Sequence, residues 1–116
     1  MTFSMAGTIL DSSIWIALFH RSDSQHIKAV KVFDTLSTRI VLPEYVVLET
    51  SSVLLKKASK KIAEMFVERT IDNEDVELLL SQESLFLETL EYFRTMRQKT
   101  LSFVDISLLL LSRYYT

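Results

Sequence analysis

Three carboxylates stand where acids are least expected in this sequence. Asp11 closes a short apolar run, Glu49 lies among valines and leucines, and Asp105 interrupts the apolar segment Leu101–Ile106. Acids usually lie on solvated surfaces, because burying an unpaired carboxylate is unfavourable. A shared cation would neutralise three such groups beside a core, and hard cations such as Mg²⁺ and Mn²⁺ prefer oxygen ligands. The pattern therefore predicts a metal site formed by Asp11, Glu49 and Asp105.

Each acid also has a simpler explanation. Asp11 precedes a predicted helix and could cap its N-terminus, where Asp is among the preferred residues. Ser102 and Asp105 have the spacing of a capping box, although the acid is Asp and not the usual Glu or Gln. Glu49 could reach from the edge of the core to water, but its mid-helix position excludes a capping role. These alternatives stay open at the level of sequence.

Composition describes an ordinary globular chain whose 116 residues fit one domain. The net charge of −2 means that any nucleic acid would have to be attracted by local patches. The absence of cysteine excludes disulfides, thiolate metal sites and cysteine nucleophiles, and suits the cytoplasm. The single glycine excludes a phosphate-cradling glycine loop. No apolar run approaches the ~20 residues of a membrane span, and no secretion signal is present, so we expect a cytoplasmic protein.

Apolar spacing predicts strands and helices that alternate along the chain. The predicted strands are Gly7–Asp11, Arg39–Leu42 and Val76–Leu80. The predicted helices are Ser12–Ser22, Ser24–Leu36, Pro43–Ala58, Lys60–Thr70, Ser84–Arg97 and Ser102–Tyr115. Ser24 is the expected cap of the second helix, whose inward residues are expected to be Ile27, Val30, Val32 and Phe33. Strands separated by helices imply a parallel sheet in an α/β sandwich, with Asp11 at the sheet edge where such folds form sites.

Three segments of the chain resemble the PIN-domain ribonucleases, and most closely the VapC-type toxins of toxin–antitoxin pairs. These segments are Ile9–Trp15, Leu48–Ser51 and Leu101–Leu109. The resemblance implies a three-layer α/β/α sandwich with a short, mostly parallel sheet, and endonucleolytic cleavage of RNA with Mg²⁺ or Mn²⁺. It also implies a cognate antitoxin protein and a homodimer.

The same resemblance implies that Asp11, Glu49 and Asp105 are the catalytic residues and the metal ligands, with Ser12 beside the first. PIN domains usually continue into a strand ending in Thr-x-Asp, which adds a fourth acidic position. The sequence ends before such a strand, so we expect a single PIN-like domain over residues 1–116 that lacks it. Glu83 follows the third strand and is a weak substitute.

The only dense basic cluster is Lys56–Lys61. Favourable charge at a helix C-terminus together with solvated surface would explain it. Its functional alternative is phosphate contact near the mouth of the site. That basic surface could be extended by further cations, namely Arg94, Arg97, Lys99 and Arg113. His20 and His26 have the wrong spacing for a shared metal on one helix face and are expected to be surface or packing residues.

An apolar stripe is predicted on the next-to-last helix, formed by Phe86, Leu87, Leu90, Phe93 and Met96. Most such stripes belong to the core, and part of this one could serve a dimer or antitoxin interface. Two other functions compete with the nuclease. One is a non-catalytic RNA- or protein-binding domain of the same fold. The other is a phosphoacceptor signalling domain, which is disfavoured because Asp11 has no acidic neighbour and Glu49 lies in mid-helix.

Overall fold

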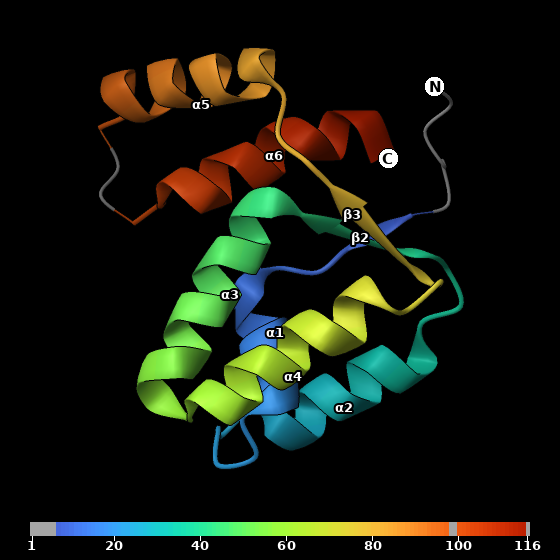
Figure 1. Ribbon diagram of the computed structural model, residues 1–116. Helices are drawn as coiled ribbons and strands as arrows, with labels where there is room; N and C mark the ends of the chain where they lie inside the picture. The colour runs from blue at the N-terminus through green and yellow to red at the C-terminus, as the bar shows by residue number, and fades with distance from the viewer. Residues whose placement is uncertain (1–6, 98–99, 116) are drawn as a thin grey trace.

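A three-stranded parallel sheet lies between two layers of helices in the computed structural model, which describes residues 7–97 and 100–115 (Figure 1). The strands are β1 (Thr8–Ile9), β2 (Ile40–Pro43) and β3 (Val76–Leu79), in the order β1-β2-β3. Every residue of the central strand β2 is buried, as expected for a parallel strand covered on both faces. The predicted parallel sheet is therefore confirmed.

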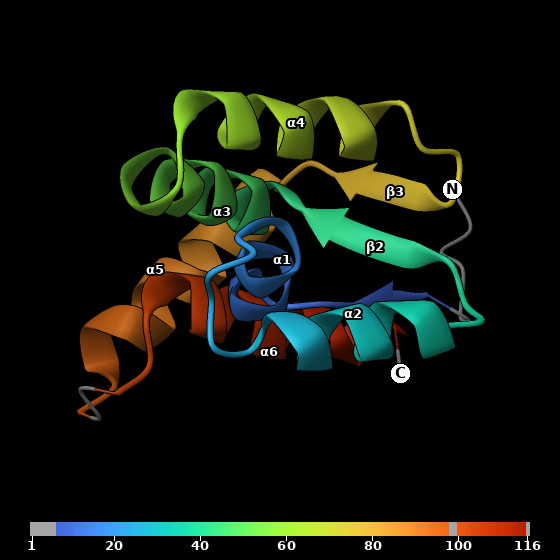
Figure 2. The same ribbon diagram turned by 90° about the horizontal axis from the view of Figure 1, so that it is seen from below.

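Within the described residues, a layer of helices covers each face of the sheet (Figures 1 and 2). The first layer holds α1 (Ser12–Phe19), α2 (His26–Thr35), α3 (Glu44–Lys57) and α4 (Lys60–Ile71). The second layer holds α5 (Glu83–Thr95) and α6 (Phe103–Tyr115). The strands follow one another across the sheet in chain order. Because crossovers between parallel strands are right-handed, the β1–β2 and β2–β3 connections lie on the same face. The α/β/α layering predicted from the resemblance is confirmed.

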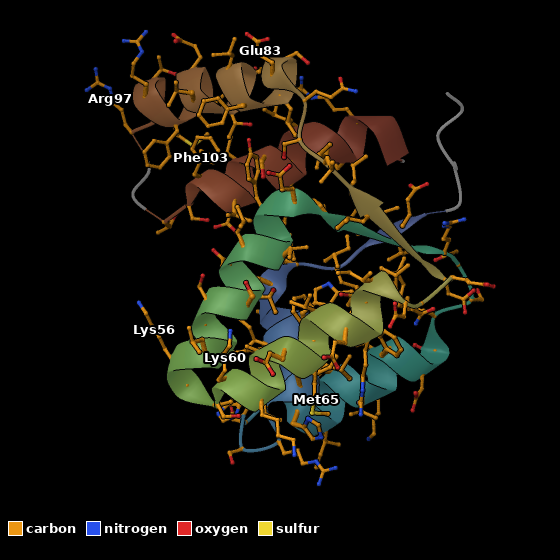
Figure 3. The ribbon with its side chains drawn as sticks, in the orientation of Figure 1. Lys56, Lys60, Met65, Glu83, Arg97 and Phe103 are labelled. Atoms are coloured by element: carbon orange, nitrogen blue, oxygen red, sulfur yellow. The ribbon has the colours of Figure 1, made fainter. Side chains whose placement is uncertain are left out.

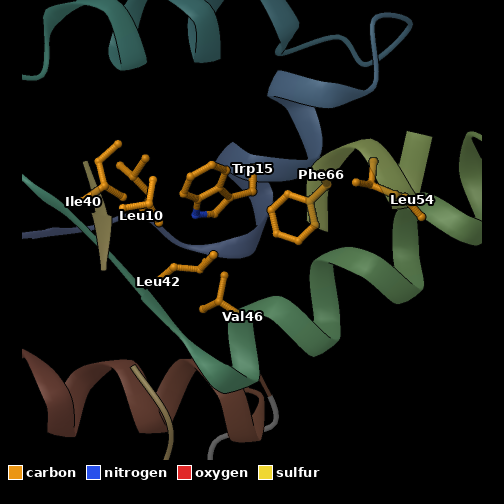
Figure 4. Packing of buried hydrophobic residues seen from close by; sticks show 9 residues of the cluster. Leu10, Trp15, Ile40, Leu42, Val46, Leu54 and Phe66 are labelled. Carbon is orange, nitrogen blue, oxygen red and sulfur yellow. The ribbon is translucent and has the colours of Figure 1, made fainter. Parts of the chain in front are cut away.

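Aromatic packing fixes α1 between the sheet and α4 (Figure 4). The Trp15 and Phe66 rings pack edge to face with centroids 5.7 Å apart, and Phe19 meets Phe66 in the same way at 5.5 Å. Leu42 of β2 and Val46 of α3 belong to the same buried cluster. Because α1 is held along its length, its N-terminus is placed firmly at the carboxyl edge of the sheet.

A second aromatic group joins the two layers at that edge. The ring of Phe103, at the start of α6, packs against Tyr45 in the first turn of α3 with centroids 5.6 Å apart. Phe86 and Phe93 of α5 pack against the same ring of Phe103, labelled in Figure 3, with centroid distances of 5.6 and 6.0 Å. The N-terminus of α6 is thereby placed beside the N-terminus of α3.

The second helix differs most from its prediction. It begins at His26 with Gln25 as N-cap residue, so the proposed Ser24 cap is wrong. Two residues expected to face inward, Ile27 and Val32, are 70% and 39% exposed, and the buried residue of α2 is Ala29. The reason is that α2 packs mainly against α1, and one neighbour buries only a narrow stripe.

Smaller differences occur at element ends. The first helix stops at Phe19 and not Ser22, the fifth spans Glu83–Thr95, and Pro43 closes β2 and precedes α3. Shifts of this size reflect frayed helix ends. Across the part of the chain that the structure describes, no helix is long and apolar enough to cross a membrane.

Candidate metal site at the carboxyl edge of the sheet

The carboxyl ends of the strands meet at one edge because the sheet is parallel. At this edge Glu44, the first residue of α3, accepts a hydrogen bond from the backbone N–H of Ser81 at 2.9 Å. This bond ties the exit of β3 to the start of α3. The sequence did not single out Glu44, since an acid in a first helical turn has an ordinary role beside the helix dipole.

Asp11 caps α1 at this edge. Its Oδ1 accepts hydrogen bonds from the backbone N–H of Ser13 at 2.6 Å and from the Ser13 hydroxyl at 2.5 Å. The capping alternative is therefore confirmed. Asp11 is also exposed, so the expectation that all three acids adjoin the core is wrong for this residue. A carboxylate that follows a strand of only two residues already reaches solvent.

Glu49 is half-buried on α3 and accepts a hydrogen bond from the hydroxyl of Ser12. The neighbouring Thr50 is fully buried, whereas Leu48 is 57% exposed. Glu49 therefore lies at the boundary of the core, facing the N-terminus of α1. The contact brings a predicted ligand together with the residue next to Asp11.

Asp105 lies in the first turn of α6 and forms the predicted capping box. Its Oδ2 accepts from the backbone N–H of Ser102 at 3.0 Å, and its own N–H donates to the Ser102 hydroxyl at 3.1 Å. The side chain is half-buried. The alternative that Asp105 caps a helix is thus also confirmed. Capping uses only one of its two carboxylate oxygens.

The three acids share one arrangement. Each accepts hydrogen bonds with one oxygen, Asp11 and Asp105 from residues close in sequence and Glu49 from Ser12 of α1, and within residues 7–97 and 100–115 the other oxygen accepts none. The same residues contain no group of three or more His, Asp or Glu side chains spaced to hold a metal ion. The structure therefore joins Ser12 to Glu49 and brings the N-terminus of α6 to the same edge, without closing Asp11, Glu49 and Asp105 around one point.

The other acids considered as possible ligands lie at the sheet edges that their positions in the chain predict. Glu83 is exposed in the first turn of α5 (Figure 3). The three acids between α4 and β3 are exposed at the opposite edge of the sheet: Asp72, Glu74 and Asp75.

The basic cluster Lys56–Lys61 is divided by the end of α3. Lys56 extends away from the helix, and Lys60 begins α4 (Figure 3). Lys60 lies 3.8 Å from Glu64, whereas Lys57 lines a groove with α1 and α2. The cluster is therefore not one continuous phosphate-binding surface.

Two of the more distant cations form ion pairs. Arg94 hydrogen-bonds Glu91 at 2.7 Å, which lowers the pKa of the Glu91 carboxyl, and Arg113 lies 3.7 Å from Glu88. Arg97 is exposed, and Lys99 lies outside the described residues.

The two histidines line a cleft of about 730 Å³ between α1, α2 and α4. His26 Nδ1 lies 2.7 Å from the carbonyl oxygen of Ala17 and so links the start of α2 to α1. The interpretation of His26 as a packing residue is confirmed.

A short parallel sheet between two helical layers defines an α/β/α domain, and Asp11, Glu49 and Asp105 are its candidate site residues. The chain belongs to the PIN domain family, because residues 8–115 match that family. No curated protein matches the sequence. Among solved structures, the fold is similar to that of Mycobacterium tuberculosis VapC20, described as a Sarcin-Ricin loop cleaving toxin. The TM-score is 0.84 at 19% identity, over 90% of this chain and 80% of that one. At this identity the likeness shows the fold alone.

Proposed function

We propose that this protein is a Mg²⁺- or Mn²⁺-dependent endoribonuclease, the toxin of a toxin–antitoxin pair. The observation that carries the proposal is the PIN domain match over residues 8–115, which supports a nuclease. The structural likeness to a VapC toxin that cleaves the Sarcin-Ricin loop supports RNA as the substrate. Such a substrate is consistent with action in the cytoplasm.

Asp11, Glu49 and Asp105 are the proposed ligands. Their oxygens form the donor set that a hard cation prefers, and each keeps one oxygen that accepts no hydrogen bond from the described part of the chain. Ser12 holds Glu49, and Ser102 holds Asp105. Binding of the ion would draw these carboxylates together, since attraction to a dication outweighs their mutual repulsion.

When bound, the divalent ion supplies an activated water and neutralises charge on the phosphoryl oxygens. The chain's own contribution would be to orient the three carboxylates through hydroxyl and amide donors, which come from Ser13 for Asp11, Ser12 for Glu49 and Ser102 for Asp105. No protein nucleophile is required, which suits a sequence without cysteine. The expected products carry 5′-phosphate and 3′-hydroxyl ends.

Cleavage of RNA tests this proposal. Wild-type protein should cut RNA with Mg²⁺ or Mn²⁺ and lose activity in excess EDTA. An RNA with one deoxynucleotide at the cut site should still be cut, because the attacking water replaces the 2′-hydroxyl as nucleophile. The variants Asp11→Asn, Glu49→Gln and Asp105→Asn should lose activity, whereas Asp72→Asn at the opposite edge should retain it. Cyclic phosphate products would contradict the proposal.

A second candidate is a catalytically weak PIN domain that binds RNA or protein. It is favoured by one observation, that no three acids of the described residues are spaced to hold an ion. Calorimetric titration with Mn²⁺ separates the two functions. Binding by wild type that is lost in Glu49→Gln supports the nuclease, and folded protein that neither binds Mn²⁺ nor cuts RNA supports the binding domain.

The proposed partners are an antitoxin protein and a second copy of this chain. Four apolar residues of α5 are largely exposed: Phe86, Leu87, Leu90 and Phe93. α5 packs mainly against α6, so these residues are only partly covered, with the rings of Phe86 and Phe93 against Phe103; the alternative that the whole stripe belongs to the core is therefore wrong. Burying them against a second copy would remove this apolar surface from water.

A further inference from the structure

A groove of about 480 Å³ opens between α1, α2 and α3. One stripe of each helix forms its walls, with Ala17 of α1, Lys28 and Val32 of α2, and Val53 and Lys57 of α3. Its lining combines apolar side chains with polar and charged ones. The groove is separate from the cleft that contains the two histidines, since α2 turns a different face to each.

Two helices connect this groove to the candidate metal site. On α3, Glu49, Val53 and Lys57 follow one another at four-residue intervals and so lie on one stripe. At 1.5 Å of rise per residue, Lys57 lies about 12 Å along the helix from Glu49. On α1, Ser13 both lines the groove and donates to Asp11 at 2.5 Å. A ligand at the acids could therefore continue into the groove without leaving the surface.

Charge distinguishes the two sides of α3. Lys28 and Lys57 approach the groove from different helices, and the acid among its lining residues, Asp23, already accepts from the backbone N–H of Gln25 at 2.8 Å. The groove on the opposite side of α3, of about 410 Å³, is lined by one lysine and two glutamates: Lys60, Glu64 and Glu68. The charged lining residues thus sum to +1 on the α1–α2 side (two lysines and one aspartate) and to −1 on the α4 side (one lysine and two glutamates), so the α1–α2 side is the more favourable of the two for a polyanion.

We propose that the groove between α1, α2 and α3 binds the single-stranded RNA backbone next to the cleaved bond. Lys28 and Lys57 contact phosphates, and the apolar lining residues lie against a ribose or base. The inference rests on the proposed function in taking RNA as the substrate, and it adds the path of the strand and the residues that hold it. The flexible backbone of a single strand can follow a narrow groove that a duplex cannot enter.

Binding without catalysis tests the groove separately from the nuclease activity. The affinity of full-length protein for fluorescent oligouridylate is measured by anisotropy in EDTA over a range of salt concentrations. The variant Lys28→Gln/Lys57→Gln should bind about tenfold more weakly, and its salt slope should fall by ~0.7 for each lysine removed. The matched variant Lys31→Gln/Lys61→Gln, which removes the same charge outside the groove, should bind like wild type. Equal losses in both variants, or in neither, would overturn the proposal.

Protection of introduced cysteines from alkylation shows where the RNA strand binds. The chain has no cysteine, so single thiols can be placed at Val32→Cys, inside the groove, and at Ile27→Cys, on the exposed face of the same helix. Oligouridylate in EDTA should slow alkylation at position 32 severalfold and leave position 27 unchanged. If oligouridylate does not slow alkylation of the thiol at position 32, the proposal is overturned. That result is expected if the groove binds a protein segment instead of RNA. If groove binding is found but Mg²⁺ produces no cleavage, the nuclease proposal fails and the groove stands.

Discussion

At the scale of single residues, the candidate ligands have two roles that do not exclude each other. Asp11 and Asp105 each cap a helix with one carboxylate oxygen, and the other oxygen accepts no hydrogen bond within the described residues. A cap restricts the rotamer of its side chain and so orients the remaining oxygen. The local explanation of these acids is therefore compatible with the proposed metal site.

Substitutions at the α6 capping box should separate the two roles. Ser102→Ala removes the hydroxyl that accepts from Asp105, and should lower the free energy of unfolding by about 1 kcal/mol in urea titrations. Asp105→Asn keeps an oxygen for the Ser102 N–H and should change stability less, while Mn²⁺ affinity falls at least ~10-fold. If Asp105→Asn retains full Mn²⁺ affinity, Asp105 is a cap only.

The Glu91–Arg94 pair predicts a small pH effect. The hydrogen bond from Arg94, followed by its charge, holds the pKa of Glu91 below the ordinary 4.5. A carboxyl whose pKa is lowered by folding stabilises the protein above its unfolded pKa, and this contribution is lost as pH falls through the folded pKa. Solvent screening keeps the effect small, because both groups are exposed. Arg94→Gln should raise the pKa of Glu91 toward 4.5 in an NMR titration; an unchanged pKa would contradict the pairing.

At the scale of elements, α1 is the part of the fold that positions the site. Ser12 and Glu49 attach its first turn to α3, and His26 contacts the Ala17 carbonyl near its end. Between these contacts, Trp15 is buried against Phe66 of α4. Core packing therefore holds the helix whose N-terminus carries Asp11.

Truncation of Phe66 should damage both stability and the site. Phe66→Ala leaves a cavity beside Trp15 and Phe19, and should lower the free energy of unfolding by about 3–5 kcal/mol. Mn²⁺ affinity should also fall under conditions where the variant is folded, because α1 is less firmly placed. Ile27→Ala is the control: at 70% exposure it should change stability by no more than ~0.5 kcal/mol. Equal effects of the two substitutions would contradict the packing.

At the scale of the whole molecule, α5 leaves several large apolar residues partly exposed to solvent. Leu90 is 44% exposed and stands between Phe86 and Phe93, whose rings reach inward to Phe103. The aromatic group thus anchors α5 to α6 and α3, but within the described residues it leaves the apolar stripe of α5 only partly covered. A second copy would complete the packing of this helix.

Leu90→Glu should convert the proposed dimer to a monomer, because it places a charge in the apolar interface. Sedimentation velocity should show wild-type protein as a dimer and Leu90→Glu as a folded monomer. Ile27→Glu places the same charge on α2 and should remain a dimer. A monomeric wild type at high concentration would refute the interface.

The sequence by itself determined the features that depend on neighbours along the chain. The alternation of strands and helices, the buried run Ile40–Leu42 and the Ser102–Asp105 capping box followed from the spacing of residues within a few positions. The resemblance to PIN domains, carried by short segments around the three acids, also required no tertiary information. Such signals are readable because helix caps and backbone periodicity act over one or two helical turns.

Only the tertiary structure decided which apolar faces are covered and which distant side chains meet. It left Ile27 and Leu90 exposed, joined Glu44 to Ser81, and placed Lys28 and Lys57 in one groove. None of these follows from helical spacing, because a stripe is buried only where another element packs on it. Contacts across 37 residues, such as that between Ser12 and Glu49, exist because the parallel sheet brings separate strand ends to one edge.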